Sequence, residues 1–311
     1  MSLGVLFPGQ GSQFVGMGAD LFEGRPDLLG DRSDQILGWS LREMCLEGPE
    51  QDLTRTEHAQ PALFALSYAL WDILAEALLS QPAGAAGHSL GEYTALTAAD
   101  GIEYETALDV VARRGKAMAD AADLEPSGMA ALIGGDEDLA MSIATRRQGD
   151  GGRLEVANIN APGQVVLAGG ADDINWVVAN ARDLGVRRAI PLKVAGAFHS
   201  SFMEPAADEV AGALAEIEVD RLAFPVWSNT TATQHDPGTV SELLIRQMVS
   251  PVRFSDCLLG MADAGIDTFV HVGPGDVTAG MARRSVENST VVVVSTIDDI
   301  PAAVEVIGTM T

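Results

Sequence analysis

The chain has 311 residues, of which 47% are hydrophobic and 20% are charged. This composition is typical of a globular protein with one or two domains and argues against disorder. The formal net charge of −25 argues against a nucleic-acid partner, because phosphate binding requires clustered lysine and arginine.

No run approaches the roughly 20 apolar residues that a membrane span needs, and the N-terminus has no basic-then-apolar signal. The two cysteines, Cys45 and Cys257, lack the spacing of metal or redox motifs. We therefore expect a cytoplasmic protein without a membrane, metal or redox site, and we take a monomer as the default state.

The first predicted element is a short apolar strand at residues 4–7. Apolar residues at spacings of three and four predict a helix over 63–79, and further helices reach to about Met118. Between them lies Gly87-His88-Ser89-Leu90-Gly91, the G-x-S-x-G spacing that places a serine on a sharp turn between a strand and a helix. This order predicts an α/β core with a mainly parallel sheet.

The middle of the chain has a different pattern. Predicted elements follow in the order β-α-β-β-α-β, which is typical of a ferredoxin-like unit. They are a strand at 129–133, a helix at 136–147, strands at 154–158 and 165–168, a helix at 172–184 and a strand at 188–192. Strands at 268–272 and 291–294 then resume the α/β pattern.

Charge separates the same segments. Residues 128–192 carry a net −2, whereas residues 1–127 carry −13 and residues 193–311 carry −10. We therefore predict an α/β-hydrolase-like large domain with a parallel sheet, formed by 1–127 and 193–311. An inserted ferredoxin-like small domain would occupy 128–192, and the cleft between the two is a common place for a ligand.

Ser89 needs a general base, because a serine hydroxyl alone is a weak nucleophile. Of the five histidines, we favour His199, which small residues and Phe198 surround where the chain returns to the large domain. The other four have structural explanations. His88 adjoins Ser89 and is expected to point away from it, and His58 lies in a segment that could be a turn. His235 has the composition of a surface loop around it, and His271 lies inside a predicted strand.

Arg114 lies in the middle of the apolar face of a predicted helix around 107–118. Burying a guanidinium is costly unless it is paired. Spacing alone leaves two explanations open, an internal salt bridge to a carboxylate such as Glu92 and a bidentate clamp for a substrate carboxylate. Similarly, Gly9-Gln10-Gly11 is either a plain tight turn or a source of oxyanion-hole N–H groups.

Eight segments between residues 4 and 295, in the same order, closely resemble the malonyl-CoA:acyl carrier protein transacylases of fatty acid synthesis. They are Phe7-Pro8-Gly9-Gln10-Gly11-Ser12-Gln13, Gly87-His88-Ser89-Leu90-Gly91-Glu92-Tyr93, Arg113-Arg114-Gly115-Lys116-Ala117-Met118, Asn158-Ile159-Asn160-Ala161-Pro162-Gly163-Gln164, Ala197-Phe198-His199-Ser200, Asn229-Thr230-Thr231, Gln247-Met248-Val249-Ser250-Pro251-Val252-Arg253 and Val272-Gly273-Pro274-Gly275.

The resemblance implies a Ser–His dyad in which Ser89 takes up the malonyl group and His199 is the base. It also implies that Arg114 holds the malonyl carboxylate, and that the backbone N–H groups of Gln10 and Leu90 form the oxyanion hole.

The same resemblance assigns further substrate-site residues. The backbone carbonyl of Gln247 would orient His199, and Asn160 would line the cleft. Phe198 before the histidine is similar to malonyl-selective members, so we expect malonyl to be preferred over methylmalonyl.

The implied reaction is ping-pong transfer of malonyl from malonyl-CoA to the phosphopantetheine thiol of acyl carrier protein, without a cofactor. Acyl carrier proteins are acidic, so an acidic enzyme needs a less acidic docking surface. We expect that surface to consist of Arg182, Arg187, Arg188, Lys193, Arg283 and Arg284. A simply solvated face is the alternative.

The main rival function is a serine esterase or thioesterase of the α/β-hydrolase type. It would pair Ser89 with the late histidine His271 and an acid at Asp267 or Asp236. A non-catalytic binding protein is a second rival, but such a protein would be expected to lose Ser89, His199 or Arg114.

Overall fold

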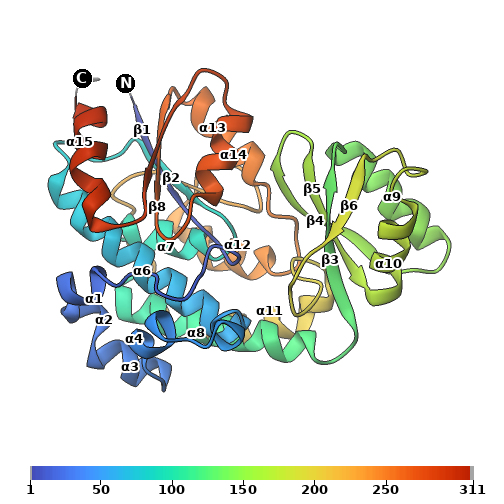
Figure 1. Cartoon of the computed structure of the whole chain (residues 1–311), viewed down its shortest axis with the longest axis horizontal. Helices are drawn as coiled ribbons and strands as arrows, with labels where there is room; N and C mark the ends of the chain where they lie inside the picture. Colours follow the sequence, from blue (N-terminus) through green and yellow to red (C-terminus); the bar gives the residue numbers. More distant parts are fainter. Residues whose placement is uncertain (1, 309–311) are drawn as a thin grey trace.

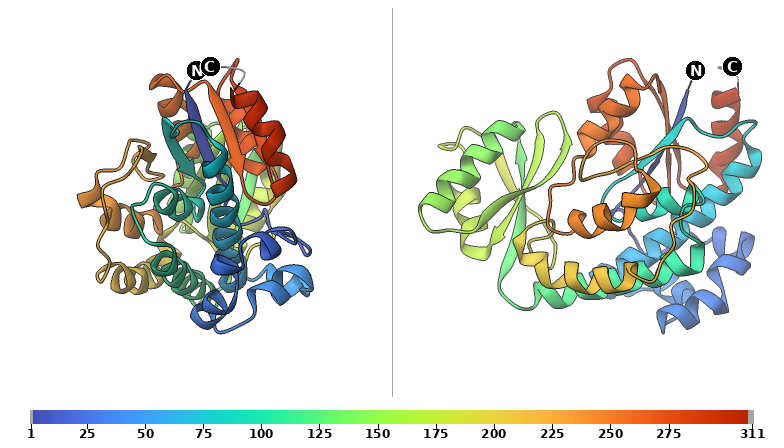
Figure 2. Two further views of the ribbon diagram at one scale, coloured as in Figure 1. Left: turned by 90° about the vertical axis from the view of Figure 1, so that its left-hand side faces the viewer. Right: turned by 180° about the vertical axis from the view of Figure 1, so that it is seen from behind.

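The computed structural model describes residues 2–308, which form two units with a sheet each (Figures 1 and 2). Within these residues the larger unit contains a five-stranded parallel sheet with the order β7-β2-β1-β8-β9. Its strands are β1 (Leu3–Phe7), β2 (Gly84–Gly87), β7 (Val226–Trp227), β8 (Thr268–Val272) and β9 (Thr290–Val294). The central strands are buried almost throughout, as is typical of a parallel sheet covered on both faces.

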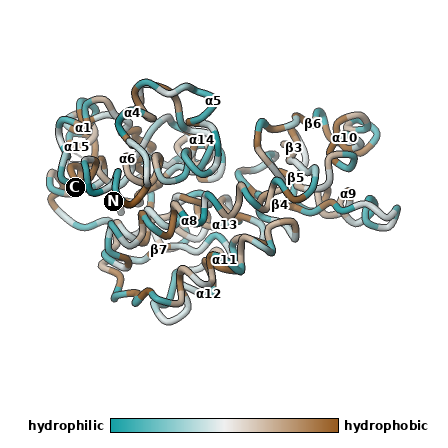
Figure 3. The backbone as a smooth tube through the Cα atoms, turned by 90° about the horizontal axis from the view of Figure 1, so that it is seen from below, coloured by the Kyte–Doolittle hydropathy of each residue, from teal (hydrophilic) through white to brown (hydrophobic). Residues whose placement is uncertain are grey.

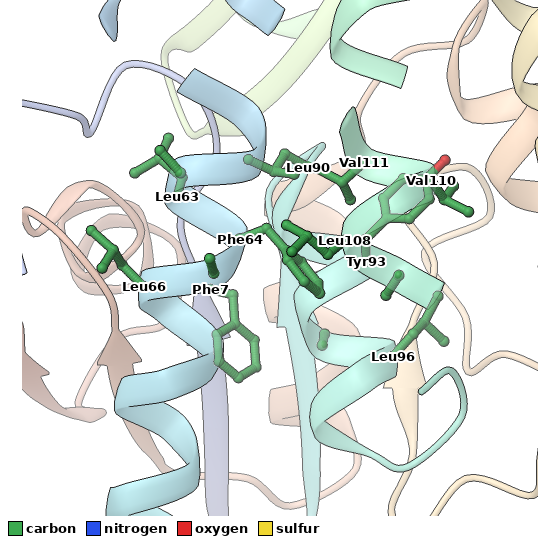
Figure 4. Close-up of a cluster of buried hydrophobic side chains, with 14 of the residues drawn as sticks. Phe7, Leu63, Phe64, Leu66, Leu90, Tyr93, Leu96, Leu108, Val110 and Val111 are labelled. Carbon is green, nitrogen blue, oxygen red and sulfur yellow. The ribbon is translucent and has the colours of Figure 1, made fainter. Parts of the chain in front are cut away.

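Alternate side chains of β1 pack against helices on opposite faces of the sheet. Val5 and Phe7 belong to the cluster with α6, α7 and α8, part of which is drawn in Figure 4. Leu6 packs with α13 and α14 on the other face. These helices are α6 (Thr56–Ala77), α7 (Gly91–Ala98), α8 (Tyr104–Ala122), α13 (Phe254–Asp263) and α14 (Val277–Ser285).

Shorter helices complete the large unit. Those between residues 21 and 53 pack on α6 and α8, and α15 packs on β9 and α6. They are α1 (Leu21–Gly24), α2 (Pro26–Leu29), α3 (Asp31–Leu37), α4 (Leu41–Leu46), α5 (Glu50–Leu53), α11 (Glu204–Leu214), α12 (Val240–Gln247) and α15 (Ile300–Gly308), with the 3-10 turns η1 (Ser201–Met203), η2 (Pro237–Thr239) and η3 (Ile297–Asp299).

The smaller unit projects from one side of the larger one (Figures 1 and 3). Its antiparallel sheet has the order β4-β5-β3-β6, and α9 and α10 lie beside it. The elements are β3 (Ser127–Ile133), α9 (Glu137–Gly149), β4 (Leu154–Ala161), β5 (Gln164–Gly170), α10 (Ala171–Asn180) and β6 (Arg188–Pro191).

Side chains of the small sheet alternate between two environments, as expected for strands with both faces covered. Ala130 and Leu132 on β3 pack in the cluster with α9 and α10. Met129 and Ala131 face the opposite way and join the core of the large unit. The sheet therefore presents one face to its own helices and the other to the large unit.

Two contacts attach the small unit to the segment before α13. The backbone of Val252 donates to Ala157 at 2.9 Å and accepts from Ile159 at 2.9 Å, which extends β4 by one bridge. The guanidinium of Arg253 forms a bidentate ion pair with Glu137, at 3.0 and 3.1 Å. Both contacts hold the small unit against the segment that precedes α13.

Most predicted elements lie within a few residues of their expected positions, but the first long helix does not. It begins at Thr56 rather than at residue 63, so His58 lies on α6 and not in a turn. Pro61 lies inside this helix, where its nitrogen cannot donate the backbone hydrogen bond to Glu57. This extension brings Gln60 to the site described next.

Candidate active site

Ser89 occupies a strained turn between β2 and α7. Its φ is 52°, in the left-handed region that non-glycine residues rarely adopt. A Cβ on Gly87 would collide with the backbone of Gly91, and one on Gly91 would collide with the carbonyl of Phe7. The Ser89 N–H donates to Oδ1 of Asn229 at 2.7 Å, which helps to hold the turn. The predicted turn at Gly87–Gly91 is therefore present. Glycine is required at both ends of it, because neighbouring backbone atoms leave no room for a Cβ.

His199 lies against the Ser89 hydroxyl, with Nε2 2.7 Å from Oγ. Its other ring nitrogen, Nδ1, is 2.9 Å from the backbone oxygen of Gln247. Because a carbonyl can only accept, Nδ1 carries the proton and Nε2 is free to accept from the serine. Burial, and after it the charge of Arg114, lowers the pKa of His199 to about 3, so the ring is neutral.

Arg114 is fully buried on α8, and its guanidinium reaches the same serine. Nη2 donates to Ser89 Oγ at 3.1 Å and to Gln247 Oε1 at 2.9 Å, and Nη1 donates to Gln60 Oε1 at 2.5 Å. Desolvation by burial lowers the pKa of Arg114. Among the described residues no carboxylate forms an ion pair with it. The internal salt bridge to Glu92, one of the two explanations above, is absent.

Two backbone N–H groups near Ser89 are free. Within residues 2–308 neither Gln10 nor Leu90 donates a backbone hydrogen bond. Both residues line the cleft that Ser89 and His199 also line. The Gln10 side chain donates to Thr56 Oγ1 at 3.2 Å, which anchors the glycine-rich turn to the start of α6.

The cleft between the two units has a volume of about 250 Å³. Phe198 lines it from the large unit, and Asn160 lines it from β4 of the small unit. Oδ1 of Asn160 accepts from Nε2 of His88 at 2.8 Å, so this pair crosses the cleft beside Ser89. Burial lowers the pKa of His88, which favours the neutral ring.

The six basic residues expected to dock a carrier are all exposed, and several lie near the cleft. Ile133 on β3 pairs with Arg188 on one side and Gln164 on the other, and Gln164 Oε1 accepts from Arg284 at 2.9 Å. Lys193 lines the cleft itself. The remaining three are Arg182 after α10, Arg187 before β6 and Arg283 on α14.

The alternative serine–histidine arrangement is not assembled. His271 is buried in β8, where Nδ1 lies 2.5 Å from Thr278 Oγ1 and Nε2 lies 3.1 Å from the Gly273 oxygen. Asp267 and Asp236 are exposed and contact other groups. His271 therefore makes no hydrogen bond to Ser89, and the serine–histidine pair of the esterase alternative is not formed.

Several residues of the site were not found from the sequence. Glu92, buried on α7, accepts from His235 and from the side chain of Gln247, both at 2.6 Å. His235 was expected in a surface loop, and that expectation was wrong, because its side chain is fully buried against Glu92. Gln60 lies in the same segment as His58, which was expected to be a turn. Glu92 was considered as a direct partner of Arg114, but its contacts with His235 and Gln247 were not predicted.

No helix within residues 2–308 is both long and apolar enough to cross a membrane. In the same part of the chain, no three histidine, cysteine, aspartate or glutamate side chains converge so that they could hold a metal ion.

Comparison with known proteins gives consistent matches along the chain. Residues 5–311 match the family model described as an acyl transferase domain. A Bacillus subtilis protein named malonyl CoA-acyl carrier protein transacylase is 36% identical over 303 residues, covering 96% of this chain and 95% of its own length.

Solved structures match equally well. An acyl carrier protein S-malonyltransferase from Vibrio cholerae has a TM-score of 0.91 at 37% identity, covering 97% of this chain and all of its own. A malonyl-transacylase solved in complex with its type II PKS acyl-carrier protein has a TM-score of 0.93 at 32% identity, covering 98% of this chain and 99% of its own.

Proposed function

The chain belongs to the acyl transferase family, and we propose from this premise that it transfers malonyl from malonyl-CoA to acyl carrier protein. One observation carries the choice of acyl group. The buried Arg114 guanidinium donates to the Ser89 hydroxyl at 3.1 Å and has no carboxylate partner among the described residues. An acyl group that ends in a carboxylate supplies that partner once it is attached to Ser89.

The first half-reaction forms a malonyl-Ser89 ester. His199 Nε2 takes the Ser89 proton as Oγ attacks the thioester carbonyl carbon. The free N–H groups of Gln10 and Leu90 stabilise the negative charge that develops on the carbonyl oxygen. When the carbon–sulfur bond breaks, CoA leaves with the proton from His199.

The second half-reaction reverses these roles. The phosphopantetheine thiol of the carrier gives its proton to His199 and attacks the ester carbonyl. The bond to Ser89 Oγ then breaks, and Ser89 regains its proton from His199. Gln247 holds the ring throughout through its backbone oxygen, 2.9 Å from Nδ1, so no third carboxylate is needed.

The fold assignment follows the same premise. We assign an α/β-hydrolase-like large domain to 1–127 and 193–311, and a ferredoxin-like insertion to 128–192, with residues 1 and 309–311 outside the described part of the chain. The order β3-α9-β4-β5-α10-β6 and the strand order β4-β5-β3-β6 support the insertion. We propose a monomer as the working state.

Phe198 and Asn160 complete the proposed substrate site. Both line the cleft beside Ser89, and Phe198 is 5% exposed. An aromatic side chain at this position leaves little room for a branch on the acyl group, so we propose malonyl in preference to methylmalonyl.

We further propose that the exposed cations around the small unit receive the acidic carrier. Their position supports this role, since Lys193 lines the cleft and Arg284 contacts Gln164, another lining residue. The group consists of Arg182, Arg187, Arg188, Lys193, Arg283 and Arg284. Such a surface would offset the repulsion between two acidic proteins.

A transfer assay tests the proposed function. The enzyme is incubated with malonyl-CoA and a phosphopantetheinylated carrier protein, and loaded carrier and free malonate are both measured. We expect loaded carrier to form with little malonate. Release of malonate without loaded carrier would instead identify a hydrolase.

A further inference from the structure

A buried carboxylate that the proposed mechanism does not use lies behind the site. Glu92 has no exposed surface. Its Oε1 accepts from His235 Nε2 at 2.6 Å, and its Oε2 accepts from Gln247 Nε2 at 2.6 Å and from the Asn229 N–H at 3.2 Å. All three contacts are donors, which suits an ionised carboxylate. In this contact His235 Nε2 is the donor, because a carboxylate oxygen can only accept.

Glu92 fixes the orientation of the Gln247 side chain. Gln247 Oε1 accepts from Arg114 at 2.9 Å, while its Nε2 donates to Glu92 and to the Ser89 carbonyl at 3.0 Å. A guanidinium can only donate, and a carboxylate and a carbonyl can only accept. The amide therefore has a single orientation that satisfies all of these groups, with its oxygen toward Arg114.

The bridge separates two buried opposite charges by one amide group. A direct pair between Glu92 and Arg114 would occupy the guanidinium donors and compete with a substrate carboxylate. Through Gln247, the negative charge instead offsets part of the cost of burying the arginine. No protein group takes the Nε donor of Arg114 among the described residues.

We propose that Glu92 is a positioning residue that sets the preference for acyl groups ending in a carboxylate. It acts through Gln247, which holds Arg114 in place without neutralising it. The inference rests on the proposed malonyl transfer and deepens it, by naming the residue that keeps the carboxylate site available.

The test compares Glu92→Gln with wild type on malonyl-CoA and acetyl-CoA. A glutamine at 92 removes the negative charge from the bridge. Even if His235 moves its proton to Nδ1, which has no partner among the described residues, and the glutamine keeps its oxygen toward Gln247, that hydrogen bond no longer has a charged acceptor. We expect the ratio of kcat/KM for malonyl-CoA to that for acetyl-CoA to fall about tenfold, because a hydrogen bond to a charged group is lost or misdirected. A merely structural role would lower both values equally and leave the ratio unchanged.

Asp173→Asn is the matched control. Asp173 is also a buried carboxylate, but its partners are Arg147 Nε at 2.6 Å and the Arg153 N–H at 2.9 Å, within the small unit. The same chemical change there should leave the selectivity ratio within twofold of wild type.

A second variant keeps the inference testable if Glu92→Gln does not fold. Gln247→Met removes the amide bridge but retains the backbone carbonyl that contacts His199, so the same fall in the ratio is expected. A ratio within twofold of wild type, in folded Glu92→Gln or else in Gln247→Met, overturns the inference. Wild-type enzyme that fails to transfer malonyl would refute the proposed function itself, before any variant is measured.

Discussion

The Nε2 atom of His199 lies 2.7 Å from Oγ of Ser89, although the two residues are 110 positions apart in the sequence. Both have a left-handed backbone, with φ of 58° and 52°. Strained backbone at non-glycine residues is often found at active sites, where the surrounding structure holds it. Here the strain serves the contact between the proposed base and the proposed nucleophile.

The lowered pKa of His199 predicts an unusual pH profile. Burial, and secondly the charge of Arg114, lowers this pKa from 6.5 to about 3, so the free base stays neutral far below pH 6.5. We expect kcat/KM for malonyl-CoA to stay level from about pH 8 down to about pH 5. A decline governed by an apparent pKa near 6.5 in that range would show that His199 titrates normally.

His271 should contribute to acid lability but not to catalysis. Burial lowers its pKa from 6.5 to about 4 in the folded protein. The unfolded state therefore binds the proton first, and the stabilisation present above pH 6.5 is lost as pH falls toward 4, by about 3 kcal/mol at most.

We expect His271→Gln to retain malonyl transfer and to lose less unfolding free energy than wild type between pH 7 and pH 4.5. Urea unfolding at the two pH values measures this difference, and comparing the two proteins cancels the effect of the acidic surface. Loss of transfer in a folded His271→Gln would show that His271 takes part in catalysis, as the esterase alternative requires.

Arg114→Lys should separate acyl groups by their charge. Lysine keeps the positive charge but loses the planar fork that binds a carboxylate at two points. We expect kcat/KM for malonyl-CoA to fall by about 100-fold and that for acetyl-CoA to fall by less than about threefold.

Arg113→Lys is the matched control for that variant. The neighbouring arginine is half-buried and pairs with Asp109 on α8 and Glu209 on α11. Its replacement should leave both substrates nearly unaffected. Equal losses for malonyl-CoA and acetyl-CoA in Arg114→Lys would exclude a carboxylate clamp.

Reversing charge on the small unit should weaken carrier binding. In the double variant Arg187→Glu and Arg188→Glu, we expect the KM for the carrier to rise about tenfold at low salt and less at high salt, with the KM for malonyl-CoA unchanged. The double variant Arg32→Glu and Arg42→Glu makes the same charge change on α3 and α4 of the large unit. An unchanged carrier KM in the first variant would refute the docking surface.

The strands and helices between residues 127 and 191 lie close to their predicted positions, because glycine-rich turns separate them in the sequence. The short helices between residues 21 and 53 were not predicted, because packing on α6 and α8 stabilises them more than any local pattern. At α6, the apolar spacing indicated only residues 63–79, whereas the helix begins at Thr56.

Within the site, local motifs indicated Ser89, His199 and Arg114, whereas the network behind them could not be predicted. Glu92 contacts His235 and Gln247 across 143 and 155 residues of sequence. Periodicity and spacing carry no information on such contacts, since they depend on how β2, α7 and α12 meet in the fold.

The central claim, that Ser89 carries the malonyl group between donor and carrier, can be tested by intact-mass measurement. The enzyme is mixed with malonyl-CoA, and holo carrier protein is then added. We predict that the enzyme gains the mass of one malonyl group, that the carrier then takes it up, and that Ser89→Ala gains no mass. Ser67→Ala, at a buried serine whose Oγ has no partner among the described residues, should behave as wild type. A malonyl adduct of undiminished yield on Ser89→Ala would contradict the account.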